Sequence, residues 1–311
     1  MTRQGISASA LALVLGLAPI AAQADTPQAQ PQKIPPELAK FEAGLHKQGG
    51  DVAIPAAHAT LHLGDRYYFI PADEAATVLT KVWGNPPSAA DGVLGLVIEN
   101  GKSIYDNVWS AVVTYEDTGY VPDKNAKSED YDKVEEQIRD GEADGNAERQ
   151  KQGYATMHLV GWAQPPSYDA AQHSLIWARD IKFSDTPVDT LNYDVRLLGR
   201  KGVLSLNMLS TMNDLPEVRA AASDFGTAAA FDRGSTYADY DSSVDKTAQF
   251  GLAGLVAAGA GVVIAKKLGI LAIALGFGKW ILAAFAVAGA TMRRWIAGLF
   301  GRRPKEDQFD T

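Results

Sequence analysis

An apolar stretch near the C-terminus restricts the fold of this 311-residue chain more than any other feature. The stretch runs from Leu268 to Met292 and contains one charged residue, Lys279. A lysine near the centre of a membrane helix costs about 2.5–3.5 kcal/mol, whereas the ten Leu, Ile, Phe and Val side chains contribute about −3 to −6 kcal/mol together. Because the 25 residues are also enough to cross a bilayer with some tilt, we expect one transmembrane helix here.

The first 24 residues have the three parts of a secretory signal peptide. Arg3 supplies the positive start, residues 6–20 are apolar or small, and Ala22-Gln23-Ala24 is a small-x-small cleavage motif. The alternative, an uncleaved anchor helix, needs a longer apolar run. We therefore expect cleavage before Asp25 and export of the residues that follow.

Basic residues after the apolar stretch set the expected orientation in the membrane. They are Arg293, Arg294, Arg302 and Arg303. Basic flanks stay on the cytoplasmic side, so an exported body combined with a cytoplasmic C-terminus requires an odd number of spans. The Gly- and Ala-rich residues 250–267 then form either a flexible juxtamembrane segment, a partly inserted helix or a helix that packs against another one.

Charge is distributed unevenly along the chain. Residues 25–249 carry 20 basic and 34 acidic residues, a net charge of −14, whereas residues 250–311 carry 8 basic and 3 acidic residues, a net charge of +5. An acidic body argues against nucleic acid as its ligand, because phosphates require a basic face, and the basic tail suits an anionic membrane surface. The absence of cysteine excludes disulfides, thiol catalysis and Cys-ligated zinc.

Strand-like and helix-like segments alternate irregularly in the body. Four consecutive strand-like runs are joined by connections too short to hold crossover helices, so we expect an antiparallel meander. The runs are Ala155–Ala163, His173–Phe183, Leu191–Gly199 and Gly202–Leu209. Other predicted elements are a hairpin of residues 59–63 with 66–70, a strand at 93–98, an exposed helix at 131–138, and helices at 73–82 and 215–225. The sequence therefore predicts an α+β fold, a single mixed domain with packed helices, followed by the transmembrane helix.

Polar residues on the meander strands are candidates for acid–base chemistry. They are His158, Arg179, Asp180, Asp194 and Arg196. A His–Asp pair can transfer protons and arginines can bind a carboxylate or a phosphate, which would suit a hydrolase or a transferase. The alternative is a solvated sheet face with cross-strand ion pairs.

Metal and cofactor motifs give little support for catalysis. His58 and His62 share a strand face and, with Asp65, have the side chains of a metal site, but ordinary exposed histidines explain them equally well. The usual nucleotide, serine-hydrolase and zincin motifs do not occur in the sequence. We therefore assign no catalytic, cofactor-binding or metal-ligating residue and expect no cofactor.

Several short motifs give the chain a resemblance to a known family. They are Trp83-Gly84-Asn85-Pro86-Pro87, Gly161-Trp162, Pro165-Pro166-Ser167-Tyr168-Asp169, Leu198-Gly199-Arg200-Lys201-Gly202-Val203-Leu204 and Tyr237-Ala238-Asp239-Tyr240. In combination they resemble the predicted membrane-anchored bacterial proteins of the domain of unknown function 2167 family. The resemblance implies an envelope protein of a Gram-negative bacterium and brings no reaction with it. The last strand, the helix after it and the Tyr237 region are also similar to the end of the Mog1/PsbP-like αβα sandwich, a fold often used for binding.

These observations give one expectation for the whole chain. We expect an inner-membrane, single-pass bacterial envelope protein, with the C-terminus in the cytoplasm, that binds a protein or a small ligand in the periplasm without catalysis. Its partners would be the lipid bilayer and an envelope protein; accessory roles in transport or membrane stress remain open. The expected regions are a signal peptide (1–24), a Pro/Gln-rich linker (25–40), a periplasmic α+β domain (41–249), a juxtamembrane segment (250–267), the transmembrane helix (268–292) and a basic cytoplasmic tail (293–311).

Overall fold

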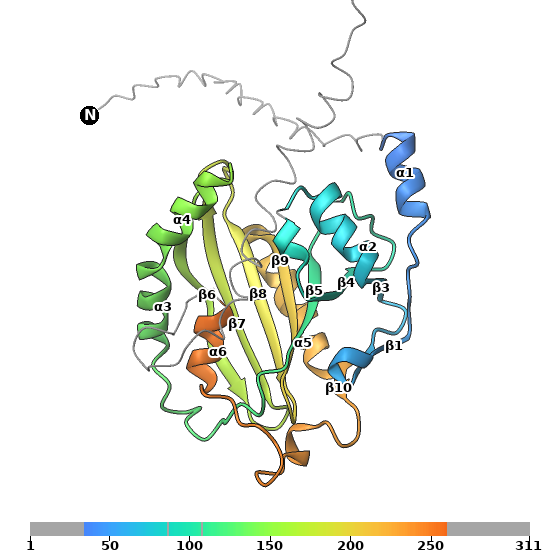
Figure 1. The fold of residues 1–311 in the computed structure, drawn as a ribbon. Helices are drawn as coiled ribbons and strands as arrows, with labels where there is room; N and C mark the ends of the chain where they lie inside the picture. The colour runs from blue at the N-terminus through green and yellow to red at the C-terminus, as the bar shows by residue number, and fades with distance from the viewer. Residues whose placement is uncertain (1–33, 86, 107, 260–311) are drawn as a thin grey trace, which may run out of the picture.

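A seven-stranded antiparallel sheet forms the centre of the computed structural model, which describes residues 34–85, 87–106 and 108–259 (Figure 1). In spatial order its strands are β3 (Tyr67–Pro71), β4 (Val93–Glu99), β5 (Ser110–Glu116), β9 (Val203–Thr211), β8 (Thr190–Leu198), β7 (Ser174–Phe183) and β6 (Met157–Asp169). The last four in the chain, β6 to β9, pair with their sequence neighbours, which confirms the predicted meander and the α+β class.

A smaller sheet of three strands lies beside the large one. It contains β1 (Asp51–Ile54), β2 (Ala59–His62) and β10 (Ala229–Phe231), in the order β1-β2-β10. The predicted hairpin between residues 59–63 and 66–70 is therefore wrong, because β2 pairs with β1 and β10 while β3 pairs with β4. Gly64, with a φ of 59°, turns the chain from one sheet into the other instead of folding it back on itself.

Helix α5 and the small sheet cover one face of the large sheet, called here the first face. Helix α5 (Leu215–Ala228) buries Val218, Ala222 and Phe225 against the apolar side chains of β8 and β9. The small sheet adds Val52, Ile54 and Leu61 to the same core. The predicted helix at 215–225 is confirmed.

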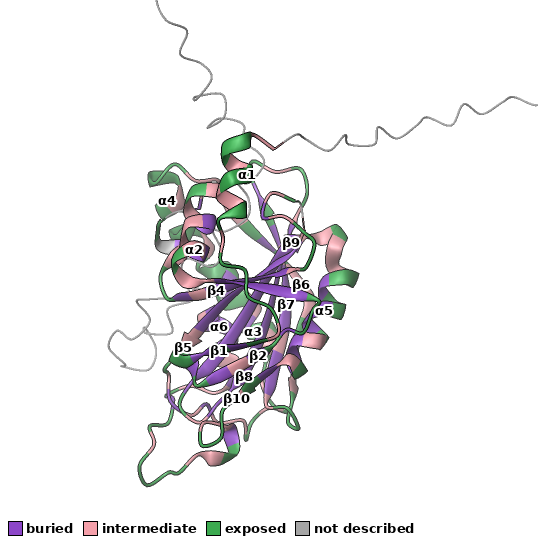
Figure 2. Ribbon diagram, turned by 90° about the vertical axis from the view of Figure 1, so that its right-hand side faces the viewer, coloured by how far each residue is buried: buried purple, intermediate pink, exposed green. Residues whose placement is uncertain are grey.

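Two separate groups of helices cover the opposite face of the large sheet, called here the second face. Helix α2 (Ala72–Thr77), which continues as a π-helical turn over Val78–Val82, packs on β3 to β5. Helices α3 (Tyr131–Asp140) and α6 (Leu252–Gly259) pack on β6 to β8, and α4 (Glu142–Lys151) follows α3. Since both faces are covered, every residue of β8 is buried, as the purple strands in Figure 2 show.

Helix α3 is less exposed than its acidic sequence indicates. Its Val134 and Ile138 are 4% and 5% exposed and pack in the same core as α6. Its remaining residues give a charged outer face, which is the pattern of an amphipathic helix. The sequence prediction identified the helix correctly but missed the face that it buries.

Helix α6 is the described part of the apolar Gly- and Ala-rich segment. Leu252, Leu255 and Val256 are fully buried in the core of the second face. Up to Gly259 this segment is thus a helix of the domain. The rest of the segment, residues 260–267, lies outside the described residues.

The predicted membrane regions cannot be located on the fold, because they lie outside the described residues. These are the signal peptide with its cleavage residues, the span from Leu268 to Met292 and the four C-terminal arginines. Among the residues that the structure describes, no helix combines the length and the apolar character that crossing a bilayer requires.

Substitution of Leu255 tests whether α6 belongs to the folded core. We expect Leu255→Ala to lower the free energy of unfolding by about 2–5 kcal/mol, because it leaves a cavity where a fully buried side chain was removed. Val244, which is 73% exposed, provides the control, and Val244→Ala should change stability by less than about 0.5 kcal/mol. Urea unfolding of the full-length protein in detergent, followed by tryptophan fluorescence, measures both. Equal effects of the two substitutions would contradict the packing of α6.

Candidate functional site

A strip of buried polar side chains crosses the second face of the large sheet between its two helical covers. We call it the polar strip; its members are Arg179 on β7, Asn192, Asp194 and Arg196 on β8, and Ser205 and Asn207 on β9. The antiparallel register aligns Arg179 with Asn192, Asp194 with Asn207, and Arg196 with Ser205. Arg179, Asp194 and Arg196 form cross-strand ion pairs on one face, as in the alternative drawn from the sequence, but that face is buried and not solvated.

Asp194 lies between the two arginines of the polar strip. Its two carboxylate oxygens each accept a bond of 3.3 Å, one from Arg179 Nη2 and the other from Arg196 Nη2. Arg196 Nη1 also donates to Glu116 Oε1 on β5 over 2.6 Å. Arg179 donates in addition to Asn192 Oδ1, and Asn192 Nδ2 donates to Asn207 Oδ1 over 3.0 Å. Hydrogen bonds and ion pairs thus tie four neighbouring strands together.

The two arginines have unequal electrostatic surroundings. Burial lowers the pKa of Arg179, which has Asp194 as its one close counter-charge in the described structure. Arg196 is buried to the same extent, but Glu116 and Asp194 together overcome the cost of burial and raise its pKa. Arg179 is therefore the less well compensated charge.

His158 and Asp180 do not join the polar strip. His158 is aligned with Lys182, and side chains alternate between faces, so His158 and Asp180 point to the first face while Arg179 and Asp194 point to the second. His158 instead pairs with Glu142 over 2.8 Å at the exposed sheet edge, and burial raises the pKa of Asp180. The acid–base pair that the alternative enzyme hypothesis requires is thus absent from the described structure.

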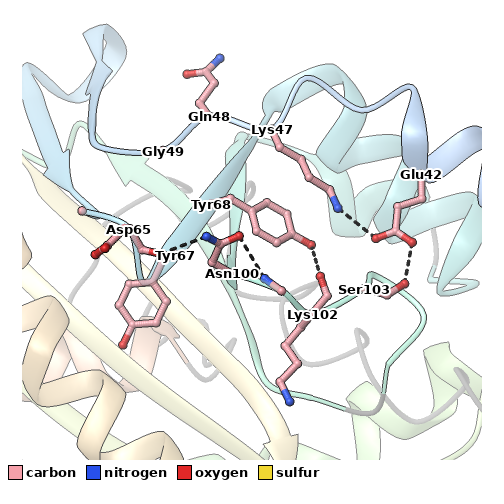
Figure 3. A pocket seen from close by; sticks show the side chains of 12 residues that line it. Glu42, Lys47, Gln48, Gly49, Asp65, Tyr67, Tyr68, Asn100, Lys102 and Ser103 are labelled. Atoms are coloured by element: carbon pink, nitrogen blue, oxygen red, sulfur yellow. Dashed lines mark hydrogen bonds and ion pairs between the residues drawn. The ribbon is translucent and has the colours of Figure 1, made fainter.

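A pocket of about 500 Å³ lies at the other end of the sheet, beside β3 (Figure 3). Its walls are the segment 47–49, the turn around Gly64 and the loop 100–103. Tyr68 lies between these walls and donates its hydroxyl proton to the carbonyl of Lys102 over 3.0 Å. Lys47 Nζ lies 4.5 Å from the centre of the Tyr68 ring, and burial raises the pKa of the Tyr68 hydroxyl well above its ordinary value. The pocket is open to solvent, and polar and apolar atoms line it in similar amounts.

Glu42 holds one side of this pocket together. Its carboxylate accepts bonds from Lys47 Nζ (3.0 Å) and Ser103 Oγ (2.6 Å), as Figure 3 shows, and from the backbone N–H of Ile104 (3.3 Å). A hydroxyl beside a carboxylate has the form of a nucleophile–base pair. The neighbouring N–H groups are all used, however: Ser103 donates to Asp106 and Tyr105 donates to Ser103 Oγ. No backbone donor of this turn is free to stabilise an oxyanion. The arrangement therefore holds the loop at Ser103 in place and does not suit acyl transfer.

Stacked rings fasten the chain at the end of the meander. Tyr240, Tyr120, Tyr237 and His173 stack in succession, with centroid distances of 3.8, 4.5 and 4.2 Å. Tyr168 donates to Asp123 over 2.7 Å and lies 3.1 Å from His173 Nδ1. Burial and the bond to Asp123 raise the pKa of Tyr168, so its phenol stays protonated. This cluster brings together the motifs around Tyr168 and Tyr237, and it attaches the segment leading to α6.

The histidines considered for metal binding have separate partners. His62 Nδ1 lies 2.8 Å from Asp51 Oδ1 on β1, and His58 ends a 3-10 turn with a φ of 49°. Among the described residues, no three His, Asp or Glu side chains are grouped so that they could hold a metal ion.

Sequence reasoning missed most of the pocket and part of the polar strip. Glu116, Ser205 and Asn207 join the polar strip only through the pairing of β5, β9 and β8, which no local pattern reveals. The pairs Gly64-Asp65 and Asn100-Gly101 were a usable signal in the sequence, because such pairs mark tight turns, and these two turns line the pocket.

Residues 46–290 match the model of a family described as protein of unknown function (DUF2167), which confirms the resemblance drawn from the motifs. A comparison with curated proteins gives no match. Among solved structures, the chain is similar to the solution structure of cyanobacterial PsbP (CyanoP) from Synechocystis sp. PCC 6803, with 8% sequence identity and a TM-score of 0.35. That match covers 58% of this chain and 91% of the other, and it is too weak to carry an argument about function.

Substitution of Asp194 tests the energetic role of the polar strip. We expect Asp194→Ala to lower the free energy of unfolding by about 3–5 kcal/mol, because it leaves the buried Arg179 without its counter-charge. The double variant Arg179→Met with Asp194→Ala should lose clearly less than the sum of the losses of Arg179→Met and Asp194→Ala alone, since it leaves no buried charge unpaired. Urea unfolding of the four proteins gives the cycle, and strictly additive losses would contradict the coupling.

Proposed function

We propose that this chain, which belongs to the DUF2167 family, is a membrane-anchored envelope protein whose α+β domain binds a small polar ligand without catalysis. The anchoring part of the proposal rests on the sequence: a signal peptide at residues 1–24, an apolar stretch at 268–292 and arginines after it. The binding part rests on the pocket beside β3.

The pocket has the size and the chemistry of a ligand site. A volume of about 500 Å³ lies in the range of small-molecule pockets, about 300–1,000 Å³. Its charged lining residues are Glu42, Lys47, Asp65 and Lys102, two of each sign. This balance favours a neutral or zwitterionic ligand, and the amide of Gln48 favours a polar one, whereas the amide of Asn100 is bonded to Asp65 and Gly101 of the pocket wall. A sugar or a dipeptide has these properties.

Binding without chemistry is favoured by how the reactive groups are used. The one hydroxyl–carboxylate pair at the pocket, Ser103 with Glu42, has its backbone donors engaged in the turn. The histidine expected to act as a base, His158, lies on the other face from Asp194. The second proposal from the sequence, an envelope hydrolase or transferase, thus loses the constellation on which it depended.

Reporter fusions test the membrane part of this proposal. With one reporter active in the periplasm and one active in the cytoplasm, we expect a fusion after Lys246 to report the periplasm and a fusion after Thr311 to report the cytoplasm. Both positions in the periplasm would mean a two-span hairpin turning at Lys266-Lys267. A cytoplasmic body would refute export altogether.

Substitution of Lys47 tests the pocket. We expect maltose or alanyl-alanine to show saturation transfer from the protein in NMR spectra, and Lys47→Met to weaken that binding about tenfold, because a hydrogen bond to a charged group is lost. The methionine keeps the apolar stem above Tyr68. Lys151, which is exposed on α4, provides the matched control Lys151→Met. Binding that is unchanged by Lys47→Met, or no binding by either probe, would contradict the proposed ligand class.

A further inference from the structure

Three different donors surround the carboxylate of Glu42 at the wall of the pocket. Its Oε1 accepts from Lys47 Nζ (3.0 Å) and from the backbone N–H of Ile104 (3.3 Å), and its Oε2 accepts from Ser103 Oγ (2.6 Å). Ser103 Oγ itself accepts from the N–H of Tyr105, so its single proton is left for the carboxylate. An ammonium, a hydroxyl and a backbone N–H around two oxygens make up a receptor for a carboxylate, and Figure 3 shows two of these contacts.

Helix α1 (Pro36–Ala43), which carries Glu42, packs loosely on the domain. None of its residues is buried, and Phe41 reaches the core only in part. A hollow of about 440 Å³ lies between the helix and Glu74 of α2. Besides the bonds of Glu42, the Tyr105 hydroxyl donates to the carbonyl of Leu38 over 3.1 Å. Elements with few buried contacts open locally at low cost, so α1 can move without unfolding the core.

The donors around Glu42 have supports that do not involve α1. Lys47 is followed by Gln48, which exchanges two backbone bonds with Phe69 on β3 (2.9 and 2.7 Å). Ile104 is held from another side, because Trp83 Nε1 donates to its carbonyl over 2.8 Å. The receptor therefore stays assembled when α1 moves away, and the motif that begins at Trp83 helps to fix the pocket wall.

We propose that Glu42 occupies a site for the carboxylate of a ligand, and that such a ligand enters the pocket by displacing Glu42 and releasing α1. This inference rests on the function proposed for the pocket, and it narrows the ligand from a sugar or a dipeptide to a compound with a free carboxylate. One carboxylate replaces another, so the three donors keep an acceptor in both states. Glu42 returns to water on a helix followed by Gly44, a residue that permits the chain to change direction.

The displacement makes the pocket selective. A group tethered to the same chain competes at an effective concentration in the millimolar range. A simple carboxylate such as acetate therefore displaces Glu42 poorly, whereas a dipeptide, which also contacts the rest of the pocket, competes well. The contact of Glu42 with its three donors thus acts as an autoinhibitory contact that only a ligand with additional interactions removes.

Removal of the charge of Glu42 tests the displacement in the full-length protein in detergent. Glu42→Gln keeps the size of the side chain, and we expect it to tighten the binding of alanyl-alanine about tenfold or more, since the open state no longer has to be selected from about 10% or less of the molecules. Maltose and alanyl-alaninamide have no carboxylate, so their binding should not change. The matched control is Glu37→Gln, on the same helix but outside the pocket lining, which should affect none of the three compounds. Isothermal titration calorimetry measures all of these affinities.

Hydrogen exchange separates displacement from simple repulsion between carboxylates, and it needs no variant. In the wild type, saturating alanyl-alanine should speed the exchange of the α1 amides about tenfold, because the bound ligand leaves the helix without the bonds of Glu42. Alanyl-alaninamide should leave their exchange unchanged. Exchange that alanyl-alanine slows or does not alter would mean that Glu42 stays on its donors, and the proposal would be wrong.

The three compounds also distinguish a failure of this inference from a failure of the proposed function. If maltose binds and Glu42→Gln has no effect on alanyl-alanine, the pocket still binds small polar ligands, and the displacement is refuted. If none of the compounds binds to the wild type or to Glu42→Gln, both proposals are refuted.

Discussion

The centre of this fold depends on the two ion pairs that the Asp194 carboxylate makes with Arg179 and Arg196. Asp194 lies on β8, whose residues are all buried, and it neutralises Arg179 on the adjacent strand β7 and Arg196 on β8 itself. An unpaired guanidinium at this depth would cost several kcal/mol, so the three charges are stable only together. Their geometry in turn depends on the register of β7, β8 and β9, because a slip of one residue would move each side chain to the opposite face. The buried ions therefore specify the alignment of the strands as much as they stabilise it.

The C-terminal part of the domain is attached at two points of this framework. Stacked rings from Tyr120, Tyr237 and His173 hold the segment that leads to α6, and the ion pair of Arg200 with Asp245 (2.7 Å) fixes its loop. Helix α6 then buries its apolar face, and the carbonyl of its Gly259 accepts a hydrogen bond from Arg179. An apolar segment that looks like membrane sequence is thus used, at least to Gly259, as part of the core of the domain.

Local patterns in the sequence were sufficient for most elements but not for their partners. Alternation and short connections identified the meander, and local patterns identified the helices near 131–138 and 215–225, because these are properties of neighbouring residues. The pairing of β2 with β10 joins residues about 170 apart in the chain, and no local pattern encodes it. The polar face of β8 was identified, but its burial depends on α6 and α3 arriving from elsewhere in the chain. The candidate pocket had no chemical motif, since it is formed by turns and by Tyr68 rather than by a reactive group.

The pairing of β5 with β9 has a consequence for the order of folding. Residues 110–116 form the middle of the sheet only when residues 203–209 have arrived, so β3 to β5 alone would expose an unpaired edge and an uncovered apolar face. Contacts so distant in sequence form slowly, because a long loop must close before they contribute. The N-terminal half of the domain thus has no stable fold of its own while the chain is incomplete. A chain interrupted before β9 would therefore leave the edge of β5 open to pairing with the strands of other molecules.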